Sequence, residues 1–256
     1  MLKEDRLKKI LDKVNSLGNI KVNDVIEDLG VSDMTVRRDL DELESRGLLH
    51  RVHGGAISTS QYPYEELSHK DKKIINIEAK RAVAKAALPY IQSGETIFLG
   101  PGTTMEILAG LIPDIDIRIV TNCLPVFKKL GKLKQAKLYL IGGEMRTLTE
   151  SFHGNLANNA LESMNFHKAF FSCNAVHDKA IMTATFEEGS SQKIALNNSN
   201  EKYLLIDSYK VNKRDFFTYY SLDNIDKVFI DDNNLFATQY IEGITEVTTV
   251  STANET

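Results

Sequence analysis

The chain has no tryptophan, only two cysteines and only five prolines in 256 residues. The cysteines, Cys123 and Cys173, lie in different segments without Cys-x-x-Cys spacing, so we interpret them as buried packing residues, not as a disulfide, redox pair or zinc site. No apolar run approaches the ~20 residues that cross a bilayer. The start, MLKEDRLKKIL, lacks the apolar core of a signal peptide. We therefore expect a cytoplasmic protein with no membrane segment, metal or cofactor.

The composition excludes a disordered tail and suits a protein with two domains, because 42% of the residues are hydrophobic, 26% are charged and the formal net charge is only −4. A polar stretch, STSQYPYEELSHKD, lacks sustained periodicity and holds a proline. The sequence therefore predicts an N-terminal domain over residues 1–57, a linker over 58–71 and a second domain over 72–256.

Residues 20–55 carry the pattern of a helix-turn-helix. Apolar residues recur at helical spacing up to Leu29, and Gly30 follows where a helix stop commonly needs a positive φ. Ser32 is a good N-cap, so a second helix restarts after a corner too tight for anything but two packed helices. The pattern predicts a DNA-binding motif whose second helix reads the groove.

The second helix divides into two faces. Its spacing turns Val36, Leu40 and Leu43 inward, whereas Met34 and Arg38 point outward. Either Arg37 or Arg38 can approach guanine bidentately or clamp a phosphate, and which does which stays open. Acidic residues follow from position 39, so only the first two turns are expected to enter the groove. The candidate DNA contacts of the helix and of the wing described next are Ser32, Asp33, Met34, Thr35, Arg37, Arg38, Arg51 and His53.

A short basic hairpin follows this helix. Residues 48–52 alternate toward strand, and Gly54-Gly55 can turn the chain back, so the tip would offer Arg51 and His53 to the DNA backbone or minor groove. A bare helix-turn-helix pattern can also be an ordinary three-helix scaffold, and the wing argues against that alternative. Residues 1–57 hold ten basic against eleven acidic side chains, so we expect modest affinity per protomer and an oligomer on repeated half-sites.

The second half alternates between strand and helix. A helix is predicted over residues 72–93, followed by short β-rich runs separated by helical stretches. Residues 138–141 and 203–206 are apolar in succession, which is typical of strands covered on both faces. The sequence predicts an α/β fold with a mostly parallel sheet, whose ligands bind at the C-terminal ends of the strands. The predicted strands read TIFLG, IRIVT, AKLYLIGG, KAFFSC, KYLLID and KVFID.

Polar or glycine-rich groups fall at four of these strand ends. GPGTT opens a helix after the first strand and supplies hydroxyls and free amides for an anion, without the spacing of a nucleotide-binding loop. A sugar phosphate fits this pattern, with Arg146 or Lys210 to offset its charge, although both are equally compatible with solvated surface cations. The candidate effector contacts are Gly100, Gly102, Thr103, Thr104, Thr121, Asn122, Gly142, Gly143, Arg146, Asp207 and Lys210.

A family resemblance runs through both halves. The stretch SDMTVRRDLDELESRGLLHRVHGGA resembles the DNA-binding domain of the DeoR family of bacterial sugar-operon regulators. GPGTT, TNCLPVF, IGGEMR, CNAV, ALNN, EKYLLIDS and DFFTYYSLD resemble the sensor half of the same family, in particular its branch that controls lactose phosphotransferase operons. The resemblance implies a sensor fold like that of ribose-5-phosphate isomerase and an effector such as tagatose 6-phosphate or galactose 6-phosphate. Gln192 departs from the pattern, since many members carry Lys there, unless Lys193 is the matching position.

We therefore predict a repressor that binds double-stranded operator DNA of a sugar-catabolism operon and is released by a phosphorylated sugar. One alternative is a regulator of another phosphotransferase-system sugar operon. A second is an isomerase-like enzyme, but Asp178 and the Glu187-Glu188 pair do not make a convincing acid-base pair at one strand end. A third is a sugar-phosphate binding protein whose first domain only dimerises, which a gel shift would distinguish.

Overall fold

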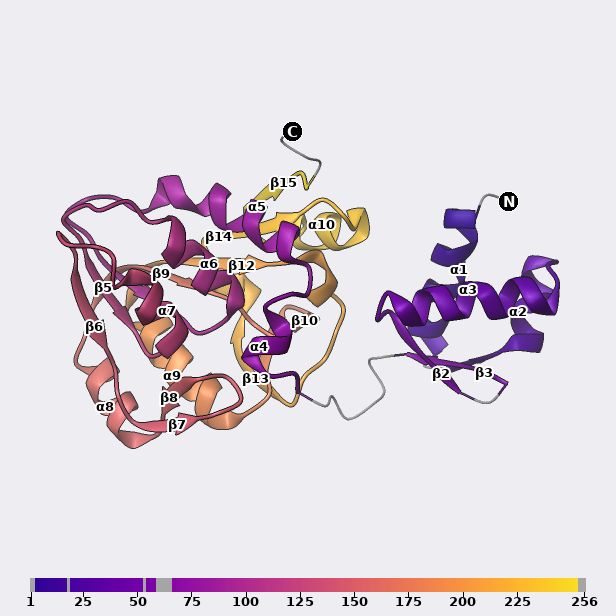
Figure 1. Ribbon diagram of the computed structural model, residues 1–256, viewed down its shortest axis with the longest axis horizontal. Coiled ribbons are helices and arrows are strands. Elements are labelled where there is room, and N and C mark those ends of the chain that lie inside the picture. The colour runs from indigo at the N-terminus through magenta and orange to yellow at the C-terminus, as the bar shows by residue number, and fades with distance from the viewer. Residues whose placement is uncertain (1–2, 18, 53, 59–65, 253–256) are drawn as a thin grey trace. The chain divides into compact units, whose positions relative to one another are not determined.

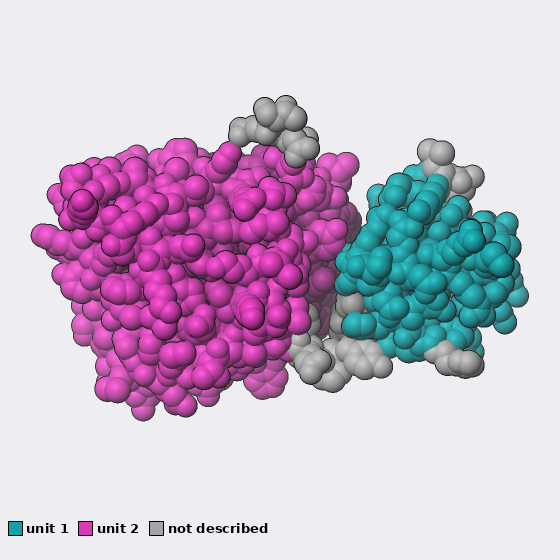
Figure 2. Space-filling view, in the orientation of Figure 1, with its two compact units in different colours: residues 1–65 teal, residues 66–256 magenta. Residues whose placement is uncertain are grey.

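The chain folds into two compact units, residues 1–65 and 66–256, coloured teal and magenta in Figure 2. The computed structural model describes residues 3–17, 19–52, 54–58 and 66–252, with the backbone alone at 15–17 and 19. The expected linker, 58–71, is wider than the structure supports. Ser58 lies in a strand of the first unit, and residues from Glu66 onward belong to the second. The prediction was too wide because side chains that form ion pairs in the fold have the same polar character in the sequence as those of a solvated linker.

The first unit is a helix-turn-helix with a β-wing. A three-stranded antiparallel sheet in the order β1-β3-β2 carries the wing hairpin, and β3 pairs with both neighbours. Three helices enclose an apolar core that includes Val14, Val36 and Leu49. The elements are α1 (Lys3–Leu17), β1 (Asn19–Lys21), α2 (Val22–Leu29), α3 (Asp33–Ser45), β2 (Leu49–Val52) and β3 (Gly55–Ser58).

The second unit is built on a seven-stranded sheet, as Figure 1 shows. All six strand pairings are parallel, which confirms the expected α/β class. The order across the sheet is β15-β14-β12-β9-β4-β5-β6. The strands are β4 (Thr96–Leu99), β5 (Arg118–Thr121), β6 (Lys137–Leu140), β9 (Phe166–Phe171), β12 (Ser199–Ile206), β14 (Lys227–Asp231) and β15 (Val247–Val250).

Helices cover both faces of this sheet. One apolar cluster joins α5, α6 and α7 to one face, and a second joins α8, α9 and α10 to the other. These helices are α5 (Ile77–Ala87), α6 (Thr103–Leu111), α7 (Leu124–Leu130), α8 (Asn155–Glu162), α9 (Phe186–Asn197) and α10 (Leu235–Glu242). Burial on two faces explains the continuous apolar run of residues 203–206. The matching prediction for residues 138–141 is wrong, because β6 is an edge strand whose Tyr139 is 45% exposed.

Shorter elements surround the sheet. The helix expected over residues 72–93 is interrupted at Asn76, whose φ is 51°, so α4 and α5 are separate helices. Ala79, Val83 and Ala87 of α5 are buried as expected. A hairpin and a three-stranded antiparallel sheet, β10-β11-β13, lie outside the main sheet. The remaining elements are α4 (His69–Lys72), η1 (Leu88–Tyr90), β7 (Glu144–Arg146), β8 (Ser151–His153), β10 (Ala175–His177), β11 (Ala180–Thr183), η2 (Ser208–Lys210), β13 (Phe217–Ser221) and η3 (Leu222–Asn224).

The sheet order contains one topological switch. The chain runs outward from β4 through β5 to β6 and then returns to place β9 on the other side of β4. Connections leave the carboxyl ends of β4 and β9 in opposite directions, and this opens a crevice between the two strand ends. The β4–β9 boundary is therefore the place in this sheet where a ligand is expected.

Candidate functional site

The first candidate site is α3, the recognition helix. Gly30 ends α2 in the left-handed conformation, with φ 63° and ψ 36°. The side chain of Ser32 caps α3 by accepting a hydrogen bond from the Thr35 amide at 3.3 Å. Both features are the ones that the sequence pattern predicts, and they fix the tight corner that lets α3 project from the unit.

The two faces of the recognition helix separate cleanly. Val36, Leu40 and Leu43 are at most 1% exposed, whereas Met34 is 65% exposed. Arg38 is also exposed, and its guanidinium has no partner in the described part of the chain. A guanidinium that is not already paired can bind a base edge or a phosphate without first losing another contact. The outward face therefore carries a cation available for DNA.

Arg37 differs from its neighbour because it is already paired. Its Nε donates to Asp33 Oδ2 at 2.7 Å, one helical turn earlier, and both side chains are about half exposed. The hydrogen bond from Arg37 holds the pKa of the Asp33 carboxyl below its usual value. An exposed pair of this kind is weak enough to exchange for a phosphate. The structure thus distinguishes a paired Arg37 from an Arg38 that has no partner in the described residues, whereas the sequence could not tell the two arginines apart.

The wing residues fit the expectation less well. The Arg51 guanidinium pairs with Asp41 of α3, and the Arg51 amide donates to Glu44 Oε1 at 2.8 Å, so the side chain lies against the helix instead of at the hairpin tip. The acidic turns of α3 attract it there. His53 lies outside the described residues. Asp39, the first of the acidic residues in α3, is 2% exposed and pairs with Arg6 of α1.

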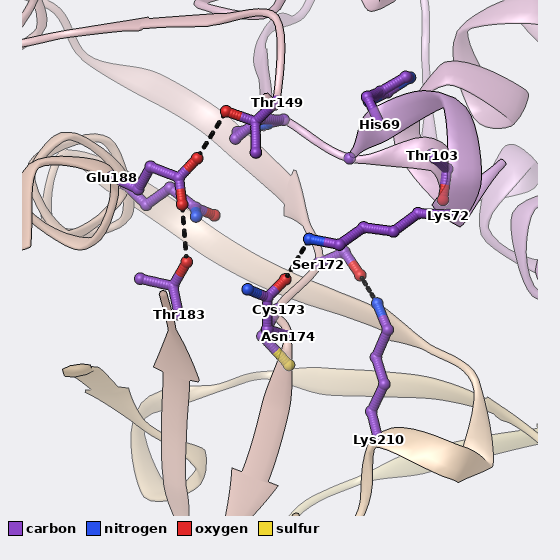
Figure 3. A pocket seen from close by; sticks show the side chains of 13 residues that line it. His69, Lys72, Thr103, Thr149, Ser172, Cys173, Asn174, Thr183, Glu188 and Lys210 are labelled. Carbon is purple, nitrogen blue, oxygen red and sulfur yellow. Dashed lines mark hydrogen bonds between the residues drawn. The ribbon is translucent and has the colours of Figure 1, made fainter. Parts of the chain in front are cut away.

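The second candidate site is a pocket at the β4–β9 switch, which we call the strand-end pocket. Gly102 and Thr103 reach it from the turn after β4, and residues 172–174 reach it from the end of β9. Lys210 comes from η2 after β12, so three adjacent strand ends contribute. Figure 3 shows these side chains converging with others from α4 and α9. The complete lining is His69, Lys72, Pro101, Gly102, Thr103, Thr149, Ser172, Cys173, Asn174, Thr183, Glu188, Gln192 and Lys210.

Two lysines project into the pocket from separate elements. Lys210 Nζ donates to Ser172 Oγ at 2.9 Å, and Lys72 Nζ lies 3.4 Å from Asn174 Oδ1 (Figure 3). Burial lowers the pKa of Lys72. Burial also lowers the pKa of nearby Lys80 to about 8, and the charge of Lys210 adds to that effect. Cations held close together in a desolvated site repel one another, and a bound anion would relieve the repulsion.

A carboxylate lies at the other end of the pocket. Glu188 on α9 is 4% exposed and accepts hydrogen bonds from Thr149 Oγ1 at 2.7 Å and Thr183 Oγ1 at 3.1 Å. Arg146 Nη1 lies 3.3 Å from the same carboxylate. The pocket therefore has a cationic end suited to a phosphate and a carboxylate end suited to sugar hydroxyls.

The structure brings only part of the predicted effector set into the pocket. Gly102, Thr103 and Lys210 line it, and Arg146 lies beside it, held by carboxylates. Local patterns do not rank the strand ends, and only the strand ends next to the switch meet at the pocket. The predicted residues outside the lining are Gly100, Thr104, Thr121, Asn122, Gly142, Gly143, Arg146 and Asp207.

Several of these outlying residues have structural roles instead. Asn122 Nδ2 donates to the Phe152 carbonyl at 2.9 Å, and Asp207 accepts from Asn76 at 3.1 Å. A Cβ on Gly143 would lie 2.4 Å from the His153 carbonyl, and its φ of 158° also disfavours a side chain, so close backbone packing requires this glycine. Asn122 and Gly143 therefore hold the ends of β5 and β6 against the β7–β8 hairpin, whereas Asp207 holds the end of β12 against the turn between α4 and α5.

Sequence reasoning missed most of the pocket wall. Cys173 was interpreted only as a packing residue, and it is indeed a buried free thiol, but it also lines the pocket. Burial raises its pKa to about 12, so it stays protonated. The sequence does not predict Glu188 as a site residue, because Glu188 lies at the start of a helix and not at the end of a strand. The other missed residues are His69, Lys72, Pro101, Thr149, Ser172, Asn174 and Thr183. Pro101 lies within GPGTT and Asn174 within CNAV, but no single local motif brings these residues together.

Comparison with known families and proteins gives consistent results. Residues 6–62 match the DeoR-like helix-turn-helix domain and residues 75–232 match the DeoR C terminal sensor domain. A lactose phosphotransferase system repressor from Staphylococcus epidermidis is 49% identical over 96% of this chain and 99% of its own length. One from Staphylococcus aureus is 50% identical over 90% and 93%, and one from Streptococcus mutans is 45% identical over 96% and 99%.

The solved structures that match are more distant. Ribose 5-phosphate isomerase A from Methanocaldococcus jannaschii covers 53% of this chain and 55% of its own, at 18% identity and a TM-score of 0.39. The eIF2B beta subunit from Chaetomium thermophilum covers 59% and 48%, at 14% identity and a TM-score of 0.40. Within the described residues, no helix is long and apolar enough to cross a membrane and no cluster of His, Cys, Asp and Glu is arranged to hold a metal.

Proposed function

The chain belongs to the DeoR family of regulators, and we propose on that premise that it represses a sugar-catabolism operon and leaves its operator when a phosphorylated sugar binds. Its relatives named as lactose phosphotransferase system repressors favour a lactose or galactose operon served by the tagatose 6-phosphate pathway. Tagatose 6-phosphate and galactose 6-phosphate are accordingly the first effectors to test. The alternative within the same class is another phosphotransferase-system sugar operon.

One observation carries the effector proposal: the strand-end pocket has lysines at one end and a hydrogen-bonded carboxylate at the other. Lys72 and Lys210 can neutralise a phosphate dianion, which a single cation cannot. Thr103 adds a hydroxyl at the start of α6. Glu188 accepts hydrogen bonds and so discriminates in favour of a ligand rich in hydroxyls. A sugar phosphate matches both ends, whereas a free sugar or inorganic phosphate matches only one.

Repression and release follow from linkage. If the effector binds preferentially to a conformation whose DNA-binding units are misplaced for their half-sites, operator affinity falls by the factor by which DNA lowers effector affinity. The near-neutral charge of the first unit supports an assembly with several recognition helices, since each alone contributes little electrostatic affinity. We therefore propose a homo-oligomer, dimer or tetramer, as the form that binds operator.

Fluorescence anisotropy with DNA from upstream of the cognate lactose operon tests the proposal. We expect tight, salt-dependent binding, and release by tagatose 6-phosphate or galactose 6-phosphate but not by the unphosphorylated sugars. Scrambled DNA of equal length is the control. Operator binding that no hexose phosphate weakens would refute the effector, whereas failure to prefer the upstream DNA would refute the regulator itself.

An enzyme is the alternative from a different class, and Glu188 in the pocket is the observation that keeps it testable. The relatives are named as repressors, and Asp178, the other carboxylate that the sequence offered, is exposed and pairs with His177 and Arg214 outside the pocket. We expect no interconversion of aldose and ketose phosphates. NMR of tagatose 6-phosphate and ribose 5-phosphate incubated with the protein checks this, with Glu188→Gln as the control for a contaminating isomerase.

A further inference from the structure

The connection between the two units enters the second unit beside the strand-end pocket. Glu66 is the first described residue after the segment 59–65 that joins the units. Its side chain is 9% exposed, although it lies next to a polar connecting segment. Arg146 of β7 holds it in a bidentate pair, with Nη1 donating to Oε1 at 2.9 Å and Nη2 to Oε2. Burial alone would raise the pKa of Glu66, but the hydrogen bonds and charges of Arg146 and Lys72 together outweigh burial, lower the pKa and keep the carboxyl ionised.

The same carboxylate is connected to the pocket by two routes. Lys72, which lines the pocket, has its Nζ 3.3 Å from Glu66 Oε1 and 3.4 Å from Asn174 Oδ1. Arg146 reaches Glu188 of the pocket wall at 3.3 Å with the Nη1 that also binds Glu66. Two cations and two carboxylates thus form one balanced network. A change in the charge of the pocket must act on Glu66.

We propose that the Glu66–Arg146 pair is a clasp that reports occupancy of the strand-end pocket to the connection with the DNA-binding unit. The inference rests on the proposed function and deepens its regulation. A dianion between Lys72 and Lys210 attracts Lys72 away from Glu66 and repels the Glu66 carboxylate. A buried carboxylate that loses a cationic partner is strongly disfavoured where it lies, so the clasp opens. Glu66 and Arg146 are positioning residues and do not touch the effector.

The contacts that follow Glu66 localise the movement. The His69 amide donates to the Leu148 carbonyl at 2.7 Å, and His69 Nε2 lies 3.0 Å from Glu106 Oε2 of α6. Ser68 caps α4 by accepting from the Asp71 amide at 3.2 Å. The helix α4 therefore stays anchored when the clasp opens, and the hinge falls at Leu67. In the sequence, Leu67 lies two residues after the segment that joins the two units.

The direction of the coupling follows from charge. The effector's negative charge opposes the clasp, so the closed clasp belongs to the form that binds operator and the open clasp to the released form. Removing the charge of Glu66 should therefore imitate the effector. The clasp also explains why Arg146, a candidate phosphate ligand by sequence, is occupied by carboxylates on both sides.

The test uses the full-length variant Glu66→Gln, which keeps the shape and removes the charge. We expect its operator affinity, measured without any sugar phosphate, to fall about tenfold, within the usual range of allosteric coupling. Glu66→Asp retains the charge on a shorter side chain, so its operator affinity should lie between those of Glu66→Gln and the unaltered protein. Glu78→Gln is the matched control, because it removes an exposed pair with Arg81 on α5.

The outcomes separate the clasp from the function on which it rests. If the unaltered protein binds operator and Glu66→Gln binds equally well, the clasp is refuted and the repressor stands. If the unaltered protein does not bind operator DNA, the proposed function and the regulatory role of the clasp are both refuted. If Glu66→Gln does not fold by circular dichroism, Glu66→Asp decides: an operator affinity equal to that of the unaltered protein would refute the clasp. Tagatose 6-phosphate should weaken operator binding by a smaller factor in Glu66→Gln than in the unaltered protein, and an equal factor in both proteins would contradict the mechanism.

Discussion

The recognition helix and the strand-end pocket differ in how far apart in the sequence their residues lie. The stop, the cap and the inward face of the recognition helix fall between Gly30 and Leu43, whereas the pocket draws on residues from His69 to Lys210. A helix face needs only its own periodicity, but the pocket needs the sheet to place distant strand ends together. Mutations in the helix should therefore impair one function cleanly, while those in the pocket should act through a shared charge network.

The largest effect should come from Arg38→Ala. Loss of an unpaired, outward guanidinium removes about 1–3 kcal/mol of base recognition per site, so operator affinity should fall by roughly 10- to 100-fold in each half-site. Anisotropy with operator DNA measures this. Calorimetry with tagatose 6-phosphate should show unchanged effector affinity. Lys8→Ala, an exposed cation on α1, is the control within the same unit. Equal losses in both variants would show that only general charge matters.

Lys210→Met should weaken effector binding and leave operator binding unchanged, which is the opposite of the effect expected for Arg38→Ala. It removes a charge-assisted hydrogen bond worth about 1.5–3 kcal/mol, so effector affinity should drop by roughly 10- to 100-fold while operator binding persists. The resulting repressor should resist induction in a reporter assay. Lys193→Met, an exposed cation on α9 outside the pocket lining, is its matched control. If Lys210→Met also weakened operator binding, the proposal that the first unit binds operator and the second unit binds effector independently would be contradicted.

The pH dependence of effector binding should show an intermediate effect. The pKa of Lys80 in the folded protein is about 8, below the 10.5 of a free lysine. A dianion nearby raises that pKa, so binding takes up protons above pH 8 and affinity should weaken by at most about tenfold per pH unit. The phosphate itself is already a dianion there, with a second pKa of about 6. Calorimetry from pH 7 to 9 checks this, and Lys80→Met should flatten the profile.

The pKa of Lys80 also fixes the sign of its effect on stability. Between pH 8 and 10.5 the unfolded chain binds more protons than the folded one, so this residue makes the free energy of unfolding rise with pH. Lys80→Met should remove that slope in urea melts. If the difference between the unaltered protein and Lys80→Met showed that Lys80 lowers the free energy of unfolding as the pH rises from 8 to 10.5, burial would not depress the pKa of Lys80.

The smallest effect is expected for Arg51→Ala. Because Arg51 pairs with Asp41 against the recognition helix, operator affinity should change by no more than about threefold, the scale of a partly exposed ion pair. The same anisotropy assay measures it beside Arg38→Ala. A loss as large as that of Arg38→Ala would mean that Arg51 leaves Asp41 to contact DNA, and would restore the expectation from the sequence.

Much of the fold was predictable, and the failures share one cause. The turn at Gly30, the cap at Ser32 and the parallel sheet were all predicted from local patterns and confirmed. The edge position of β6 was not, because apolar runs do not reveal which strand lacks a neighbour. The burial of Asp39 against Arg6 was not predicted either, because the two residues lie far apart in the sequence. Both failures concern contacts between distant residues.

The sequence by itself determined the recognition helix, because helical periodicity, a stop and a cap are encoded within a dozen neighbouring residues. It also determined that polar groups follow several parallel strands. Only the tertiary structure decided which of those groups meet, by reversing the strand order between β4 and β9. It also decided that Arg146 pairs with both Glu66 and Glu188. Coulomb energy depends on distances through space, and these are fixed only when the sheet is assembled.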